Sequence, residues 1–550
     1  MFLENDAHSK NKRLIEFSCG IIESLFVKYE DDVMMTSKIH HYITHQLPVI
    51  LECIHETKEK NKVRLTEHQD EQEKFTQQFL SQFKYYYNTS NETYFEYAGP
   101  HYKTISEDNI LHHIVSTISS ESNPILMNWK HKTKVSLLKK IKEQPITKTI
   151  PESETIQTVL QQLFPTICGT KSEVKYFLTV IGDNILRKET SRVHFISPRA
   201  RYFLRALNKV CGDTLNVQCS LTFKFKYHEK HNESLCRILN VLPLIEQTAW
   251  CDSTIDYYGL DILCVACHYS NKYGNADDYL IDFSHDNEIQ QNVFRLKNTK
   301  MEDFVTQFVE EYLIDKSDQS NQSDSSSSLT GKQMQYLWKD FLETNNYPIG
   351  LYNFAAKKCL TDKVFPRQYD VKNDVFEYIS SSHLPVIQCF LTFWNETMVE
   401  DQNEYAELEL DEIGLLFRNW QMYKSAAEQK KKKFYLKENK IIDILTYFHP
   451  ELEIVKDKYI MNTRNIGWDK DIDIEVALST LKEEKEPVVV NLYNAYKYYC
   501  DFHNKQCTRN VKTLLVSKSY FEHYINFHYG SVLDEKCSFL KKRSRSITSP

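Results

Sequence analysis

The sequence predicts a helix-rich α+β fold, in which an α+β N-terminal region precedes small helical modules. The first observation is a shortage of glycine, because the 550 residues include 12 glycines, whereas average usage would give about 39. Glycine supplies the positive φ angles of tight hairpins, so this shortage argues against a large β-barrel or propeller. The second is that apolar residues recur every three or four positions in many segments, as in amphipathic helices. The third is that residues 217–231 and 260–270 alternate or run apolar, as strands do.

The elements of the N-terminal region, residues 1–315, are predicted from spacing and from starting residues. The first helix has apolar side chains at helical spacing: Leu14, Phe17, Ile21, Ile22, Leu25 and Phe26. We interpret the aromatic stretch within residues 75–115 as a helix end, a turn and a short strand. Two further helices are expected to begin at Pro151 and Ser172.

A polar run at residues 316–330 divides the chain, and we predict that it is a disordered linker because it cannot bury a core. Beyond it, amphipathic helices are each followed by a second helical segment and an extended piece. This order is typical of winged-helix or helix-turn-helix modules, although plain packing helices give the same periodicity. The predicted boundaries are 331–400, 405–480 and 487–540, with a basic tail at 541–550.

Several classes of protein are excluded by motifs that the sequence lacks. It contains no G-x-x-x-x-G-K-[ST], no G-x-G-x-x-G and no G-x-S-x-G, which argues against a P-loop ATPase, a Rossmann dehydrogenase and an α/β-hydrolase. No pair of nucleophile and base is recognisable, so we predict neither an enzyme nor a cofactor. Because charges occur early in the sequence, we expect no signal peptide, and no apolar stretch is long enough to span a membrane. With 14 scattered cysteines, interpreted as reduced thiols, the chain is expected to be intracellular.

An arginine cluster is the most informative feature for function. The net charge is −7, so any contact with nucleic acid must come from a local patch. Five of the 15 arginines fall within 19 residues: Arg187, Arg192, Arg199, Arg201 and Arg205. Ser197 and Pro198 form a good helix start, after which Arg201, Arg205 and Lys209 repeat every four residues.

Two interpretations of this basic stripe stay open. Arginine makes planar, bidentate contacts with phosphate, which favours anion or nucleic-acid binding. The following segment, which contains Lys224 and Lys226, interleaves cations with aromatic rings and suits backbone contacts with base stacking. The alternative is a solvated helix face that pairs with nearby carboxylates.

A second candidate surface lies near the C-terminus. A helix within residues 491–500 is followed by a polar loop and a helix capped at Ser517. Lys518 and Ser519 would lie at the exposed start of this second helix, where recognition helices meet DNA. An ordinary helical hairpin that packs on its aromatic side chains is the alternative.

Other patterns are expected to be structural, and we predict no metal site. Cys264-x-x-Cys267-His268 lacks a second compact pair for zinc and is interpreted as a buried strand. His41 and His45 have no further ligand beside them. Asp469, Asp471 and Asp473 are interpreted as a loop or a helix start rich in aspartate.

Several segments resemble uncharacterised proteins of giant, mimivirus-like DNA viruses. They are the segments that begin at Pro151, Tyr176, Cys267, Leu337 and Trp468. The last 65 residues resemble the winged-helix end of D5-type viral primase-helicases and, more loosely, an RFX-type winged helix. The region of Tyr94 is faintly similar to the segment that precedes the ATPase of D5-type proteins. The ATPase core is missing, so the resemblance does not imply helicase activity.

We therefore expect a non-enzymatic nucleic-acid-binding protein of a large DNA virus that acts in replication or transcription. The expected partners are nucleic acid, with DNA favoured over RNA, and other viral replication or transcription proteins. The resemblance implies a location in the viral factory of the host cytoplasm or inside the virion. One alternative is a virion or assembly protein whose modules bind proteins. A weaker one is a degenerate helicase or primase.

Overall fold

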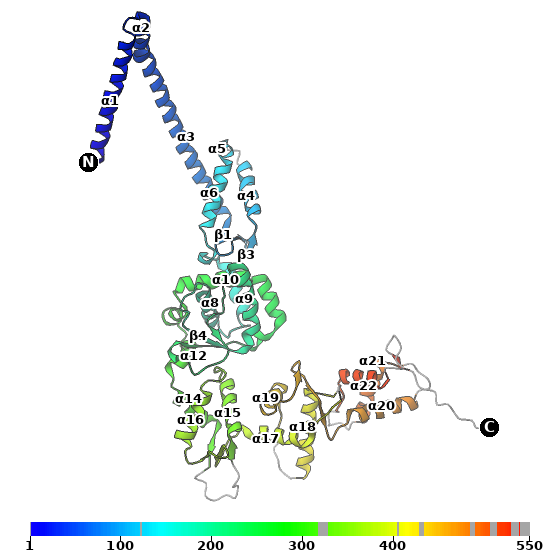
Figure 1. Cartoon of the computed structure of the whole chain (residues 1–550). Coiled ribbons are helices and arrows are strands. Elements are labelled where there is room, and N and C mark those ends of the chain that lie inside the picture. Colours follow the sequence, from blue (N-terminus) through cyan, green and yellow to red (C-terminus); the bar gives the residue numbers. More distant parts are fainter. Residues whose placement is uncertain are drawn as a thin grey trace, which may run out of the picture. The chain divides into compact units, whose positions relative to one another are not determined.

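A computed structural model (Figure 1) describes residues 2–120, 124–316, 328–403, 406–427, 434–484, 490–506, 514–529 and 538–539. The chain divides into two compact units. Unit 1 comprises residues 1–224 and 235–294, and unit 2 comprises residues 225–234 and 295–550. Helices dominate and several small sheets accompany them, which confirms the predicted helix-rich α+β class.

Unit 1 begins with long helices: α1 (Phe2–Lys28), α2 (Val33–His41), the π-helix η1 (Tyr42–Gln46) and α3 (Leu47–Gln82). A three-stranded antiparallel sheet follows, with strands β1 (Lys84–Asn88), β2 (Thr93–Ala98) and β3 (His101–Ile105) in that order. Helices α4 (Glu107–Ser120), α5 (Pro124–Asn128) and α6 (Lys130–Lys142) close a core over the end of α3. Residues 75–115 therefore contain the predicted helix end and turn, but they form three strands rather than one.

The centre of unit 1 is helical and holds a small parallel sheet. Helix α10 (Thr248–Tyr273) contacts α7 (Ser153–Leu163), α8 (Lys171–Ile185) and α9 (Arg201–Leu215). In the sheet, β4 (Val193–Ile196) lies between β5 (Phe223–Lys224) and β6 (Cys236–Leu239). A capping box between Thr170 and Glu173 starts α8. At Gly182, α8 meets α10 so closely that an added Cβ would lie 2.1 Å from the backbone oxygen of Ala266. Shorter helices complete the unit: α11 (Ala276–Asp278), the π-helix η6 (Tyr279–Phe283) and α12 (Asn287–Val293).

The two strands predicted in this region are corrected by the structure. Residues 260–270 belong to α10, and their near-complete burial explains the uninterrupted apolar run. A helix that is buried on all sides and a buried strand give the same sequence pattern over a short stretch. Within residues 217–231, the strand pairing is confined to Phe223–Lys224 and one bridge at Lys226.

Unit 2 repeats one order of elements three times: a helix, a strand, two helices and a final strand or hairpin. We call these repeats modules 1, 2 and 3. Module 1 consists of α14 (Met301–Tyr312), β8 (Ser328–Thr330), α15 (Gly331–Thr344), α16 (Asn353–Cys359) with the π-helix η7 (Leu360–Val364), β9 (Tyr369–Asp370) and β10 (Val375–Glu377). The sheet order is β8-β10-β9, so the first strand pairs with the last.

Modules 2 and 3 follow the same order. Module 2 consists of α17 (Leu384–Thr397), β13 (Glu407–Glu409), α18 (Leu410–Ala427), α19 (Glu438–Phe448), β14 (Ile454–Val455) and β15 (Tyr459–Met461), with sheet order β13-β15-β14. Module 3 consists of α20 (Lys470–Glu484), β17 (Val490–Asn491), α21 (Leu492–Gln506), α22 (Lys518–Tyr529) and β18 (Ser538–Phe539), and β17 pairs with β18. Two further antiparallel pairs join β7 (Ile314–Asp315) to β11 (Ile379–Ser380) and β12 (Met398–Glu400) to β16 (Thr463–Asn465).

The observed modules begin earlier than the predicted boundaries of 331–400, 405–480 and 487–540. Each of those ranges omits the first helix of a module, because that helix and the following short strand share no continuous apolar pattern. The predicted linker also ends too late, since Ser328–Thr330 forms β8 and Thr330 caps α15. Residues 317–327 and the predicted basic tail, 541–550, lie outside the described residues.

Candidate nucleic-acid interface

Helix α9 carries the predicted basic stripe on its exposed face. The Ser197 hydroxyl accepts a hydrogen bond from the backbone N–H of Arg199 and starts the turn that leads into the helix. Phe203 and Leu207 are buried on the inner side of α9. Arg201, Arg205 and Lys209 are exposed. Arg205 and Lys209 form no ion pair with another described residue, so both cations are available to an anionic partner.

The remaining arginines of the cluster have different surroundings. Arg187 and Arg199 are exposed, whereas the side chain of Arg192 is 14% exposed. Its guanidinium lies 3.3 Å from Asp277 and 3.7 Å from Glu189, and it donates to the side-chain oxygen of Asn275 at 2.9 Å. These contacts hold Arg192 within unit 1, so we correct its assignment as a nucleic-acid contact.

Sequence reasoning missed a second, buried cation, Arg237, which shares the partner Asp277 with Arg192. Arg237 on β6 is 3% exposed and donates to both carboxylate oxygens of Asp277, with a shortest distance of 2.7 Å. Its guanidinium also lies 4.9 Å from the ring centre of Phe294. Nothing in the local pattern Cys-Arg-Ile-Leu indicates a partner 40 residues away, so the sequence offered no signal for this structural pair.

Lys224 and Lys226 do not share a continuous strand. Lys224 is exposed on β5 of unit 1, whereas Lys226 belongs to the segment 225–234 of unit 2. Within unit 2, Tyr227 donates its backbone N–H to the Ile349 oxygen at 2.9 Å, and the Tyr352 hydroxyl donates to Glu233 at 2.7 Å. The predicted strip of alternating cations and rings is therefore corrected.

Module 1 has an open third helix and an open hairpin. On α16 and the hairpin side, the exposed cations that form no ion pair with a described residue are Lys358, Arg367 and Lys372. Phe354, at the start of α16, is 72% exposed. The surface formed by α16, η7 and the hairpin β9–β10 therefore combines available positive charge with an exposed ring.

Asp374 fixes this hairpin against the helices. It accepts hydrogen bonds from the Tyr369 hydroxyl at 2.8 Å and from Lys357, whose ammonium lies 3.0 Å away. Burial alone would raise the pKa of Asp374, but these two hydrogen bonds lower it below its ordinary value. The hairpin is thus held beside α16 by a charged carboxylate.

Module 2 presents no comparable surface, because its third helix is covered by module 1. Asp443 on α19 accepts a hydrogen bond from the Tyr336 hydroxyl at 2.6 Å and pairs with Lys339, both on α15. Lys440 of α19 pairs with Asp340 of α15. With its cations and carboxylates used in this contact, α19 cannot enter a groove of nucleic acid.

Module 3 places the predicted residues Lys518 and Ser519 at the start of α22. The Ser517 hydroxyl accepts from the Tyr520 N–H at 3.1 Å and caps the helix, as predicted. Lys518 is exposed, but its ammonium lies 3.5 Å from Glu522 on the same helix. The Tyr520 hydroxyl donates to Asp471 at 2.8 Å. Carboxylates therefore surround this helix start, which disfavours phosphate there.

A buried ion pair joins modules 2 and 3. Lys470, at the start of α20, lies 2.5 Å from Glu412 of α18, and their side chains are 6% and 4% exposed. Lys470 also donates to the Glu407 backbone oxygen at 2.8 Å and lies 4.6 Å from the ring centre of Tyr520. Glu412 accepts from the backbone N–H of Ser517 at 3.1 Å. Burial raises the pKa of Glu412, although Lys470 opposes this change.

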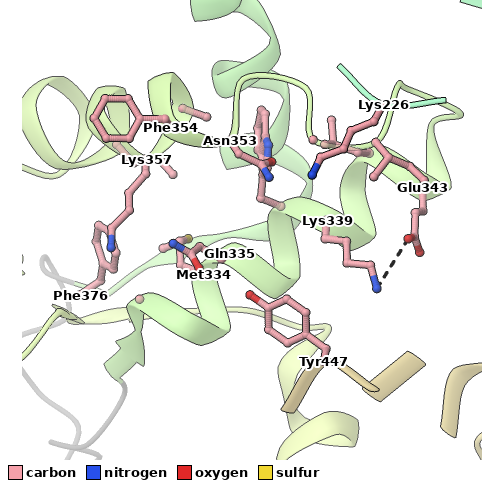
Figure 2. Close-up of a pocket in the computed structure, with 17 residues that line it drawn as sticks. Lys226, Met334, Gln335, Lys339, Glu343, Asn353, Phe354, Lys357, Phe376 and Tyr447 are labelled. Carbon is pink, nitrogen blue, oxygen red and sulfur yellow. Dashed lines mark ion pairs between the residues drawn. The ribbon is translucent and has the colours of Figure 1, made fainter. Parts of the chain in front are cut away.

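A pocket of about 470 Å³ lies beside the third helix of module 1 (Figure 2). Its lining is mostly apolar and includes Met334, Trp338, Leu342, Leu360 and Phe376. Figure 2 shows Lys357 on one side and Lys226 on the other, with Tyr447 of α19 below. A mostly apolar pocket of this size is suited to a small, mainly apolar group.

The described residues show no cluster of three or more side chains that could hold a metal ion. Cys264 and Cys267 lie on α10 rather than on the predicted strand, and burial raises the pKa of both thiols. Asp469 caps α20 through the N–H groups of Asp471 and Ile472, so the three aspartates lie at a helix start, as expected. In the part of the chain that the structure describes, no helix combines the length and the apolar character that crossing a bilayer requires.

Comparison of the chain with protein-family models, with curated proteins and with solved structures gave no match.

Proposed function

We propose that this chain binds duplex nucleic acid, with DNA favoured over RNA, through the third helix and the hairpin of module 1. The observation that carries the proposal is the repeated order of helix, strand, two helices and hairpin, in which the first strand pairs with the last. This is the arrangement expected of a winged-helix module, which places its third helix in the major groove and its hairpin on the backbone. A role in replication or transcription of a large DNA virus belongs to the same proposal and rests on the sequence resemblance alone.

Charge distribution supports module 1 as the contact. Phosphate contacts dominate the affinity of nucleic-acid-binding proteins and require cations that are free to pair. Lys358, Arg367 and Lys372 meet this requirement among the described residues of module 1. In contrast, α19 is covered and the start of α22 faces carboxylates. The stripe on α9 is a separate basic surface in unit 1, which the experiment below tests independently.

The test is a mobility-shift titration with a short DNA duplex at several salt concentrations. We expect the affinity of the full chain to fall as salt rises. The variant Lys358→Ala/Arg367→Ala/Lys372→Ala should lower the slope of log affinity against log salt by about 3, since each lost phosphate contact contributes about 0.9. The proposal would be contradicted if the full chain does not shift the duplex at low salt. It would also be contradicted if the variant has the same salt slope as the unchanged chain.

The matched control removes the same number of exposed cations elsewhere. Lys272→Ala/Lys497→Ala/Lys505→Ala takes charge from α10 and from α21, and we expect a slope close to that of the unchanged chain. A separate variant, Arg205→Ala/Lys209→Ala, tests α9. If this variant lowers the salt slope and the module 1 variant does not, the DNA contact lies in unit 1 and the assignment to module 1 is refuted.

A further inference from the structure

The first helices of the chain are uncovered over most of their length. From residue 11 to residue 67, no side chain is buried. Over the same stretch, sixteen large apolar side chains are between 37% and 80% exposed. Scattered apolar residues on a surface are normal, but exposed apolar residues that recur along the same faces of neighbouring helices indicate an interaction site.

Helix α1 carries two adjacent apolar rows. At 3.6 residues per turn, successive residues are about 100° apart, so Leu14, Ile21 and Leu25 form one row. The second row, about 100° further round the helix, consists of Ile15, Ile22 and Phe26. Phe17 widens the first row, and the apolar arc therefore covers about half of the helix circumference. Because a helix with one neighbour needs an apolar stripe of about 100°, this arc requires more than one neighbouring helix.

Helix α3 carries a single row that is partly covered. Leu47, Leu51 and Ile54 keep the alternating spacing of four and three residues that knobs-into-holes packing requires, and Leu65 lies in the same register beyond Lys58 and Asn61, which interrupt the row. The same spacing continues to Phe79, which is 1% exposed in the core of unit 1. The same row of α3 is therefore buried in the core of unit 1 at the end of the helix and exposed to solvent in the first half of the helix.

The uncovered apolar area is large enough for a stable dimer. Nine of these side chains lie in the rows of α1 and α3, and together they present roughly 700 Å² of surface for each chain, close to the ~800 Å² that a standard interface buries on each partner. A second copy of this chain brings the same open rows, so one two-fold axis covers both sets with identical contacts. The apolar rows of two copies can therefore cover each other, and no other protein is needed.

We propose that residues 11–66 form a self-association element, in which α1 and the first half of α3 pack with the same helices of a second copy. Each α1 would use its two rows on two helices of the second copy, giving a four-helix assembly. The inference is independent of the proposed function, because α1 and α3 lie outside module 1. If both hold, one dimer presents two copies of the module 1 surface.

The experiment measures the mass of the full chain in solution by light scattering after size-exclusion chromatography. We expect twice the 65.2 kDa of one chain. The variant Ile15→Lys/Ile22→Lys places charge in the second row and should give the mass of one chain. Since residues 11–28 of α1 contribute no buried residue to unit 1, the circular dichroism of the variant and its DNA retention per chain should stay close to those of the unchanged protein.

The matched control is Val27→Lys/Val33→Lys, which adds two charges to the same region. Val27 and Val33 are 71% and 80% exposed, and Val27 lies outside the apolar arc of α1. This control should keep the doubled mass. A single-chain mass of the unchanged protein, a mass above two chains, or equal behaviour of the two variants would overturn the proposal, whatever the DNA-binding result.

Discussion

Replacing Lys470 by Met tests the buried pair between modules 2 and 3. The substitution keeps much of the side-chain volume but removes the cation that lies 2.5 Å from Glu412. Glu412 would then be a buried carboxylate that keeps the backbone N–H groups of Glu409 and Ser517 as donors, at 2.9 and 3.1 Å. We expect the region around the start of α22 to lose stability and its hydrogen exchange to become faster.

The magnitude follows from the burial of both groups. Removing one partner of a buried pair costs about 3–5 kcal/mol, because the other charge stays behind without compensation. Replacing both, as in Lys470→Met/Glu412→Gln, leaves no buried charge and should cost about 1–3 kcal/mol, for imperfect hydrogen bonds alone. In the single variant Glu412 is expected to take up a proton as the pH falls, so the loss should be smaller in mild acid than at neutral pH.

The assay is urea unfolding, combined with hydrogen exchange of the α21 and α22 amides. Trp468 provides a local fluorescence signal, since its ring centre lies 5.2 Å from the Lys470 ammonium. A single variant that is no less stable than the double variant would refute the reasoning. So would a loss that does not depend on pH.

Two further predictions concern the core of unit 1. Gly182→Ala should destabilise unit 1 by about 3 kcal/mol, the upper end of the usual cost of overpacking, because the added Cβ would meet the Ala266 backbone oxygen, which cannot move without separating α8 from α10. Thermal unfolding measures this loss, and a change below about 1 kcal/mol would contradict the observed crossing. Burial lowers the pKa of His194 from its ordinary value of 6.5 to about 3. Between these two pH values the unfolded chain binds a proton at His194 and the folded chain does not. The free energy of unfolding therefore decreases as the pH falls from about 6.5 towards 3. Relative to His194→Gln, the unchanged protein should lose up to about 1.4 kcal/mol per pH unit over this range in urea titrations. Equal pH slopes in the two proteins would show that His194 does not resist protonation. Burial raises the pKa of Asp183 to about 6, which favours the folded state at low pH in both proteins, so the difference between them isolates His194.

Much of the fold class was predictable because it depends on local patterns. The shortage of glycine and the spacing of apolar residues indicated helices, and the cap at Ser517 was predicted from the sequence. The strand predicted at 260–270 was wrong because its apolar run is short, while the surrounding α10 extends over residues 248–273. Burial removed the amphipathic signal that would have revealed the helix.

The candidate site was less predictable, because availability of a cation depends on distant partners. The sequence placed Arg201, Arg205 and Lys209 on one face correctly, but it could not show that Arg192 meets Asp277, 85 positions later in the chain. It also gave no indication of the contact between α15 and α19, which covers the third helix of module 2. The cations of module 1 were missed, since they are scattered over a short helix and a hairpin and form no run.

The segment 225–234 affects how the chain can be divided for experiments. The polypeptide leaves unit 1 after Lys224, contributes ten residues to unit 2, and returns at Leu235 before leaving again after Phe294. A fragment that starts at Arg295 would therefore lack the donor to Ile349 and the partner of Tyr352, and it would lose Lys226 from the wall of the pocket. Adding a synthetic peptide of residues 225–234 to that fragment should restore the missing contacts. Neither unit is encoded by a continuous stretch of sequence, so neither can be exchanged by a single insertion or deletion during evolution.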